Sequence, residues 1–201
     1  MQTQPNSRQF PSDKKSIEDK KLHDILYLLL QSLSEWDGNV EHNRFILKKN
    51  LNKSKLSKAC GYKSRQTIYS HLNHLISQHY LIELEDRYEF PLLKNGEYFL
   101  IPYETALFLI NTQKYNVIKS YIYLAMRWIS NGNSPYEVSH KQICNAIGLY
   151  WDDQNNRDTI SSILLTLHNN FLITISSPHF SNGVTMSTVS HVDNIVRKRE
   201  A

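Results

Sequence analysis

Histidines at a metal-ligand spacing are the first residues in this chain that could do chemistry. His71 and His74 lie three residues apart in a predicted helix, so two imidazoles can meet one metal ion, and Cys60 and His79 are nearby in the sequence. No second cysteine or paired histidine motif follows. We therefore interpret both histidines as solvated or phosphate-facing side chains and expect no metal site.

Other catalytic patterns are absent from the sequence. It has no phosphate-binding glycine loop, no Gly-x-Ser-x-Gly turn and no metalloprotease helix, and its carboxylates are scattered rather than paired. Twelve tyrosines are compatible with a nicking enzyme. That chemistry also needs a metal-binding histidine cluster or a set of arginine and histidine residues, and the sequence offers neither. We expect a protein that is not an enzyme and that needs no cofactor.

Residues 63–75, KSRQTIYSHLNHL, carry polar side chains at positions suited to reading DNA. With the apolar residues of this helix in the core, Gln66, Ser70 and Asn73 point outward. Glutamine and asparagine can pair with the adenine edge, and a helix in the major groove reads bases with its N-terminal half. Polar residues on any helix also face water, so the charge of the surrounding residues must distinguish a DNA contact from a simple solvated face. The predicted DNA-binding residues are Lys55, Lys58, Lys63, Ser64, Arg65, Gln66, Tyr69, Ser70 and Asn73.

The chain around this helix is basic. Residues 42–82 contain eight lysine and arginine residues and no aspartate or glutamate, so this stretch carries +8, and the rest of the +4 chain sums to −4. A solvated face normally mixes both signs, and a long acid-free stretch therefore indicates a polyanionic partner. The predicted partner is double-stranded DNA.

The composition is that of an ordinary globular protein. The 201 residues are 40% hydrophobic and 21% charged, and no apolar run reaches the roughly 18 residues of a membrane span. The N-terminus lacks the apolar core of a signal peptide, and Cys60 and Cys144 are too few for a disulfide framework. We expect a soluble cytoplasmic protein with no membrane partner and with both cysteines buried.

The elements that must position the basic helix follow from the hydrophobic periodicity. Residues 1–16 are predicted as a flexible N-terminal arm, and a helix is predicted to start at Ser16. Its apolar stripe contains Leu22, Ile25, Leu26, Leu29 and Leu33. Short helices are expected near residues 43–49 and 54–61.

A third helix is predicted from Arg65 to about Gln78, with Ser64 as its N-cap. Its core face contains Ile68, Leu72, Leu75 and Ile76. Residues 81–93 then change to an extended pattern and predict a hairpin of two short strands, a wing. Arg87 and Lys94 could touch DNA there, although a surface ion pair is favoured for Arg87 because four acidic residues surround it.

The second half repeats this plan. Helices are expected over residues 100–110, 115–129 and 139–148 and from about Asn156, followed by strands at 171–176 and 184–190 joined by a loop at 178–183. Leu56, Ala59 and Gly61 match Ile143, Ala146 and Gly148 at an offset of 87. Thr67, Ile68, Leu72 and Leu75 match Thr159, Ile160, Leu164 and Leu167 at an offset of 92. The chain therefore contains the same unit twice, with about five residues inserted in the second turn.

The segments LSKACGYKSRQTIYSHLNHLISQHYLIEL and ICNAIGLYWDDQNNRDTISSILLTLHNNFLITI resemble the tandem winged-helix proteins of plasmids and phages of low-GC bacteria, which include replication initiators and replisome organisers. The resemblance covers two cores rather than the tails. It implies an α+β fold, mainly α with small β-hairpins, in two tandem winged helix-turn-helix domains. It also implies DNA binding, and it leaves the biological process open.

We divide the chain accordingly. Residues 17–95 are predicted as the DNA-reading winged helix, residues 96–190 as a second one used for dimerisation or partner docking, and residues 191–201 as a basic tail. The second copy has Asp158 and Leu165 where the first has Gln66 and Asn73, and Asp repels phosphate. A partner interface is predicted from three residues, Tyr150, Trp151 and Leu165. Packing of Leu165 under residues 176–201 is the alternative.

The sequence thus predicts a non-enzymatic double-stranded DNA-binding protein that acts by occupying a site, as a homodimer. Its use is expected to be transcriptional regulation or replication initiation on a plasmid, phage or other mobile element. The alternative is a winged-helix protein-interaction scaffold that does not bind DNA.

Overall fold

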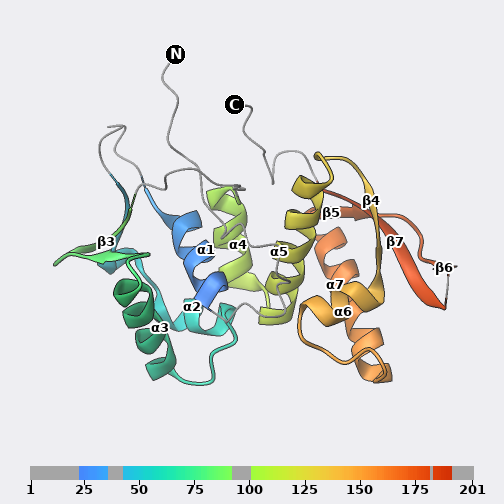
Figure 1. The fold of residues 1–201 in the computed structure, drawn as a ribbon, viewed down its shortest axis with the longest axis horizontal. Coiled ribbons are helices and arrows are strands. Elements are labelled where there is room, and N and C mark those ends of the chain that lie inside the picture. Colours follow the sequence, from blue (N-terminus) through green and yellow to red (C-terminus); the bar gives the residue numbers. More distant parts are fainter. Residues whose placement is uncertain (1–22, 36–42, 92–100, 182, 192–201) are drawn as a thin grey trace, which may run out of the picture. The chain divides into compact units, whose positions relative to one another are not determined.

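The protein is an α+β fold of α-helices and small antiparallel sheets, seen here in a computed structural model that describes residues 23–35, 43–91, 101–181 and 183–191 (Figure 1). These residues divide into two compact units, one through residue 115 and the other from residue 116. None of the helices in these ranges is both long enough and apolar enough to cross a membrane.

The first unit contains four α-helices, a short 3-10 helix and one sheet. In chain order the elements are α1 (His23–Leu33), β1 (Arg44–Leu47), η2 (Lys48–Asn50), α2 (Lys53–Ala59), α3 (Arg65–Ser77), β2 (Ile82–Glu83), β3 (Arg87–Phe90) and α4 (Tyr103–Thr112). The sheet has the order β1-β3-β2, with both pairings antiparallel.

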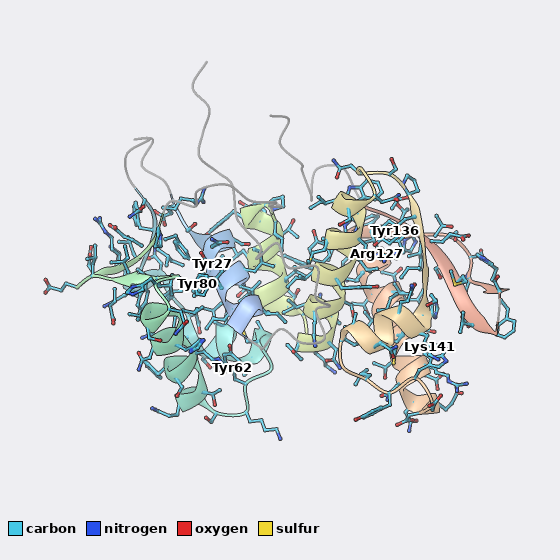
Figure 2. The ribbon with its side chains drawn as sticks, viewed as in Figure 1. Tyr27, Tyr62, Tyr80, Arg127, Tyr136 and Lys141 are labelled. Carbon is cyan, nitrogen blue, oxygen red and sulfur yellow. The ribbon has the colours of Figure 1, made fainter. Side chains whose placement is uncertain are left out.

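Helix α1 lies at the centre of the first unit. Its sequence predicts one apolar stripe, of which Ile25, Leu26 and Leu29 are buried, Leu33 is half-buried and Leu22 lies outside the described residues. Tyr27, Leu28 and Leu30 are buried as well, because α3, α4 and β1 all pack against the helix. The ring of Tyr27 also lies 5.5 Å from that of Tyr80, which follows α3 (Figure 2). The predicted start at Ser16 lies outside the described residues.

Residues 44–47 form a strand where the sequence predicts a helix. In β1, Ile46 is buried opposite Tyr88 of β3, and Phe45 exchanges backbone hydrogen bonds with Glu35 on the other side. A strand of four residues is too short to show a clear alternation, which explains the wrong assignment.

The second unit repeats the order of the first. Its elements are α5 (Tyr115–Ser130), β4 (Tyr136–Ser139), α6 (His140–Ala146), α7 (Gln154–Asn169), β5 (Ile173–Ile175), β6 (His179–Ser181) and β7 (Val184–His191). Its sheet order β4-β7-β5 places the last strand in the centre, as β3 is in the first unit. The matched apolar positions Ile68, Leu72 and Leu75, and Ile160, Leu164 and Leu167, are all buried.

The hairpin of the second unit is longer than the sequence predicts. The expected loop at 178–183 contains β6, which pairs with β7 from His179 opposite Met186 to Ser181 opposite Val184. The register between β5 and β7 differs from this by one residue, so the first strand of the hairpin bulges between β5 and β6.

Helix α4 belongs to the first unit. The sequence places the domain boundary at residues 95 and 96 and assigns this helix to the second domain, but α4 packs against α1 and α2. Its buried residues are Thr105, Ala106, Leu109 and Ile110. The two compact units therefore divide after residue 115.

The glycines that end α2 and α6 provide a matched stability test. Gly61 and Gly148 both have positive φ, +71° and +81°, but a Cβ on Gly61 would lie 2.7 Å from the Tyr115 ring, whereas one on Gly148 would only approach Lys119 Nζ at 3.8 Å. Gly61→Ala should lower the free energy of unfolding by about 2 kcal/mol or more, through both strain and overpacking. Gly148→Ala should cost about 1 kcal/mol, through strain alone. Urea unfolding of both variants measures this, and equal losses would contradict it.

Candidate nucleic-acid interface

Helix α3 begins where the sequence places it, because Ser64 caps it. The Ser64 hydroxyl accepts a hydrogen bond from the Thr67 backbone N–H at 3.3 Å and lies 2.8 Å from the Thr67 hydroxyl. Ile68, Leu72 and Leu75 are buried, as predicted, while Ile76 is only half-buried. The core thus fixes which side of α3 faces outward.

The outward side of α3 is polar. Gln66, Ser70 and Asn73 are all exposed, at spacings of four and three residues that place them on one face of the helix. The Ser70 hydroxyl reaches only the backbone oxygen of Gln66, at 3.5 Å. Arg65 is the first residue of α3, but the position of its side chain lies outside what the structure describes. The remaining polar side chains form a surface that can donate and accept hydrogen bonds.

Two predicted lysines flank this surface. Lys58, near the end of α2, and Lys63, in the turn before α3, are exposed, and their ammonium groups form no ion pair or hydrogen bond with other described residues. The third predicted lysine differs, because Lys55 donates to the side-chain oxygen of Asn111 in the last turn of α4, at 2.7 Å. The C-terminal end of a helix attracts a cation, so part of the Lys55 charge is already engaged.

Lys53 and Tyr69 form a contact that the sequence analysis did not anticipate. The Lys53 ammonium lies over the exposed Tyr69 ring, 4.6 Å from its centroid, and so joins α2 to the outward side of α3. A cation over the face of an aromatic ring is attracted by its quadrupole. Lys53 therefore adds positive charge to the predicted DNA surface and restrains Tyr69.

Other residues of the basic stretch have structural roles. Arg44 donates from its Nε to the Ser34 hydroxyl at 2.7 Å and also to the Ser34 backbone oxygen. Lys48 pairs with Glu83 at 2.8 Å. The +8 of this stretch thus overstates the charge available to a partner.

The β2-β3 hairpin of the first unit is acidic. Arg87 pairs with Glu89 at 2.8 Å, which confirms the ion pair favoured from the sequence. Leu84, Glu85 and Asp86 at the tip are exposed. Lys94 lies outside the described residues. Because carboxylates repel phosphate, this tip is unsuited to touch a DNA backbone.

The predicted histidine pair of α3 makes other contacts. His71 stacks on Tyr62 in a nearly parallel arrangement at 4.4 Å, and burial, with a smaller contribution from His74, lowers the pKa of His71. Burial raises the pKa of the Cys60 thiol to about 12. Among the described residues no three potential ligands gather.

The helix of the second unit that corresponds to α3 presents a different surface. Asp153 caps α7, and Asp158 accepts a hydrogen bond from Gln154 at 3.0 Å. Asp152, Asp153 and Asp158 are exposed around the start of α7. Such a helix end repels phosphate where α3 would attract it.

The predicted partner residues are not equally available. Tyr150 and Leu165 have exposed fractions of 84% and 53%, and residues 192–201, part of the segment under which Leu165 could pack, lie outside the described residues. Trp151 is half-buried, because the Arg157 guanidinium lies 5.2 Å from its ring centroid and donates to its backbone oxygen at 2.9 Å. The inserted turn is therefore a folded loop with one exposed aromatic ring.

Comparisons with models of protein families, with curated proteins and with solved structures gave no match. The functional argument accordingly depends on the surfaces described above.

Proposed function

We propose that each unit is a winged helix and that the chain is a non-enzymatic double-stranded DNA-binding protein. In support, both units have the order helix, strand, helix, helix and hairpin, and both sheets place the last strand in the centre. In this arrangement the helix before the hairpin is the one that enters the major groove. That helix is α3 in the first unit and α7 in the second.

The observation that carries the proposal is the outward side of α3. Gln66 and Asn73 are exposed on α3, Lys58 and Lys63 are exposed in α2 and in the turn before α3, and residues 43–82 contain no carboxylate side chain. Amide side chains can distinguish base pairs, and lysines supply the phosphate contacts that set the register on the duplex. We place base reading on α3 and phosphate contacts on α2 and the turn that follows it.

Removal of the flanking lysines should reduce the salt dependence of DNA binding. Each phosphate contact contributes about −0.9 to the slope of log affinity against log salt. Lys58→Ala combined with Lys63→Ala should make the slope less steep by about two on any duplex. Lys55→Ala should change it less, because Asn111 already binds this ammonium. Fluorescence anisotropy at several salt concentrations measures these slopes.

The matched control is Lys141→Ala, which removes an exposed lysine from α6, the counterpart of α2 in the second unit (Figure 2). It should leave the slope unchanged. If the double variant keeps the parental slope and affinity, the surface of α2 and α3 is not the DNA interface.

We propose that the second unit docks a protein partner, most simply another copy of the chain. Leu165 is exposed at the place that corresponds to Asn73, and the acidic start of α7 disfavours DNA. Two linked DNA-reading units would gain affinity by effective concentration. Leu165→Arg should leave the fold intact and lower the mass seen by light scattering to that of one chain.

The biological use proposed is regulation of transcription or initiation of replication on a plasmid, phage or other mobile element. A footprint over a promoter supports the first, and one over an origin with repeats supports the second. A gel shift with random duplex at physiological salt separates both from a protein-interaction scaffold, for which no shift is expected.

A further inference from the structure

A long stretch of the second unit carries no formal charge. All 42 lysine, arginine, aspartate and glutamate residues of the chain lie outside residues 159–192, a stretch of 34 residues in which the average of 21% would place about seven. This stretch includes most of α7 and all of β5, β6 and β7. The centre of a protein interface is depleted of charged residues in the same way, and a solvated surface is not.

Large apolar side chains are exposed along this uncharged stretch. Besides Leu165, the exposed fractions are 80% for Phe171 and 76% for Phe180. Phe171 also has a φ of +57°, in the left-handed region that a bulky side chain rarely adopts. It follows the end of α7, where glycine or asparagine would be less strained. His79, the matching residue after α3, has a φ of +59°, so this conformation belongs to the turn that ends both helices, and it is the exposure of the large Phe171 ring that points to a binding role.

The sheet of the second unit has an open edge in this stretch. Within the described residues β6 pairs with β7 and with no other strand, and it consists of only three residues centred on Phe180. Figure 1 shows the β6 end of the hairpin extending beyond α6 and α7. Edge strands are usually protected by charged side chains, whereas β6 carries no lysine, arginine, aspartate or glutamate, and its His179 lies 3.7 Å from Glu137 of β4.

We propose that the β6 edge, with Phe171 and Phe180, is the surface on which a second copy of the chain docks. The absence of lysine and arginine disfavours nucleic acid as the occupant. The absence of formal charge from residues 159–192 favours self-association, because a surface near a two-fold axis faces itself and a charged group there would meet its own sign. This inference rests on the partner docking proposed for the second unit, and it does not require that the first unit binds DNA.

Charge exchange at Phe180 tests the identity of the occupant. The full chain should have twice its monomer mass of 23.6 kDa in light scattering. Phe180→Lys and Phe180→Glu should each be monomeric, because two like charges meet across the axis. An equimolar mixture of the two should recover the dimer mass, because opposite charges then face each other. Tyr103→Ser removes an exposed ring from α4 and should remain dimeric.

Phe171→Asn separates binding from folding. Asparagine tolerates the left-handed conformation, so this variant should melt at a higher temperature than the parent and yet dimerise more weakly. A purely structural role for Phe171 predicts no loss of dimer.

A monomeric parent chain, or Phe180 variants that stay dimeric, would overturn the inference. A mixture of the two charged variants that stays monomeric would also overturn it. A DNA titration of monomeric Phe180→Lys distinguishes this failure from that of the proposed function, because a single DNA-reading unit should still bind a duplex, with the smaller salt slope that one set of phosphate contacts gives.

Discussion

Alanine at both Gln66 and Asn73 should weaken binding to the preferred duplex by about 4 kcal/mol, close to a thousand-fold, and should change binding to random duplex far less. Each side chain is exposed on the outward side of α3, near its N-terminus and middle, where a major-groove helix meets base edges. A bidentate contact with the correct base contributes about 1–3 kcal/mol of discrimination. The preferred duplex is obtained first by selection from a random pool.

The control for this variant is Ser162→Ala in α7, the counterpart of Ser70 in α3. Ser162 is exposed as Ser70 is, but the proposed interface excludes it, so its loss should leave both affinities unchanged. Equal losses of the Gln66 and Asn73 double variant on preferred and random duplex would show that these residues position the protein and do not read sequence.

Acidification should destabilise the second unit through His191. This residue, the last of β7, has an exposed fraction of 4% and lies between the rings of Tyr121 and Trp128, at 5.6 Å and 5.7 Å. By hydrogen-bond geometry neither ring nitrogen has a partner within the described part of the chain, although the Leu124 backbone lies close enough to interact with the imidazole. Burial lowers the pKa of His191 to about 4, and a contact with the Leu124 backbone opposes the decrease only in part.

The lowered pKa fixes the direction of the effect. The folded state holds the neutral imidazole, so the unfolded state binds more protons between the ordinary pKa of 6.5 and about 4. The stabilisation is fully present above pH 6.5 and is lost as the pH falls toward 4, to a total of about 3 kcal/mol. His140 is buried too and hydrogen-bonds to Ser187 at 3.0 Å, and burial lowers its pKa in the same direction.

Urea unfolding at a series of pH values measures this loss against a variant. His191→Phe keeps an aromatic ring in the site and should flatten the dependence between pH 6.5 and 4. His179→Asn removes an exposed imidazole from the same unit and should keep the parental dependence. If His191→Phe follows the parental curve, proton uptake by His191 is not the cause.

The sequence was sufficient to predict elements whose hydrophobic periodicity extends over several helical turns, or that carry a strong local signal such as a helix cap. The position of α3, its Ser64 cap and the hairpin after it all follow from residues within a few positions of each other. The strands β1 and β4 were missed because each pairs with a partner far away in the chain, such as Tyr136 opposite Val189. The strand β6 was missed because its residues were assigned to a loop.

The candidate site was predictable as a set of residue types and not as a set of contacts. The side chains of Lys55 and Asn111, 56 residues apart in sequence, meet only because α4 packs on α2. The ion pair of Lys48 with Glu83 likewise depends on how the sheet folds beside η2. No local pattern separates a lysine that is engaged in this way from the exposed Lys58 and Lys63.

A nuclear magnetic resonance titration of the isotope-labelled full chain with the selected duplex tests the division of labour most directly. We predict that amide shifts cluster over residues 58–73, the end of α2 and the first half of α3, and stay small over α7 and the acidic tip at residues 84–86. Shifts concentrated on α7, or none anywhere at saturating duplex, would contradict the claim that the first unit reads DNA through α3.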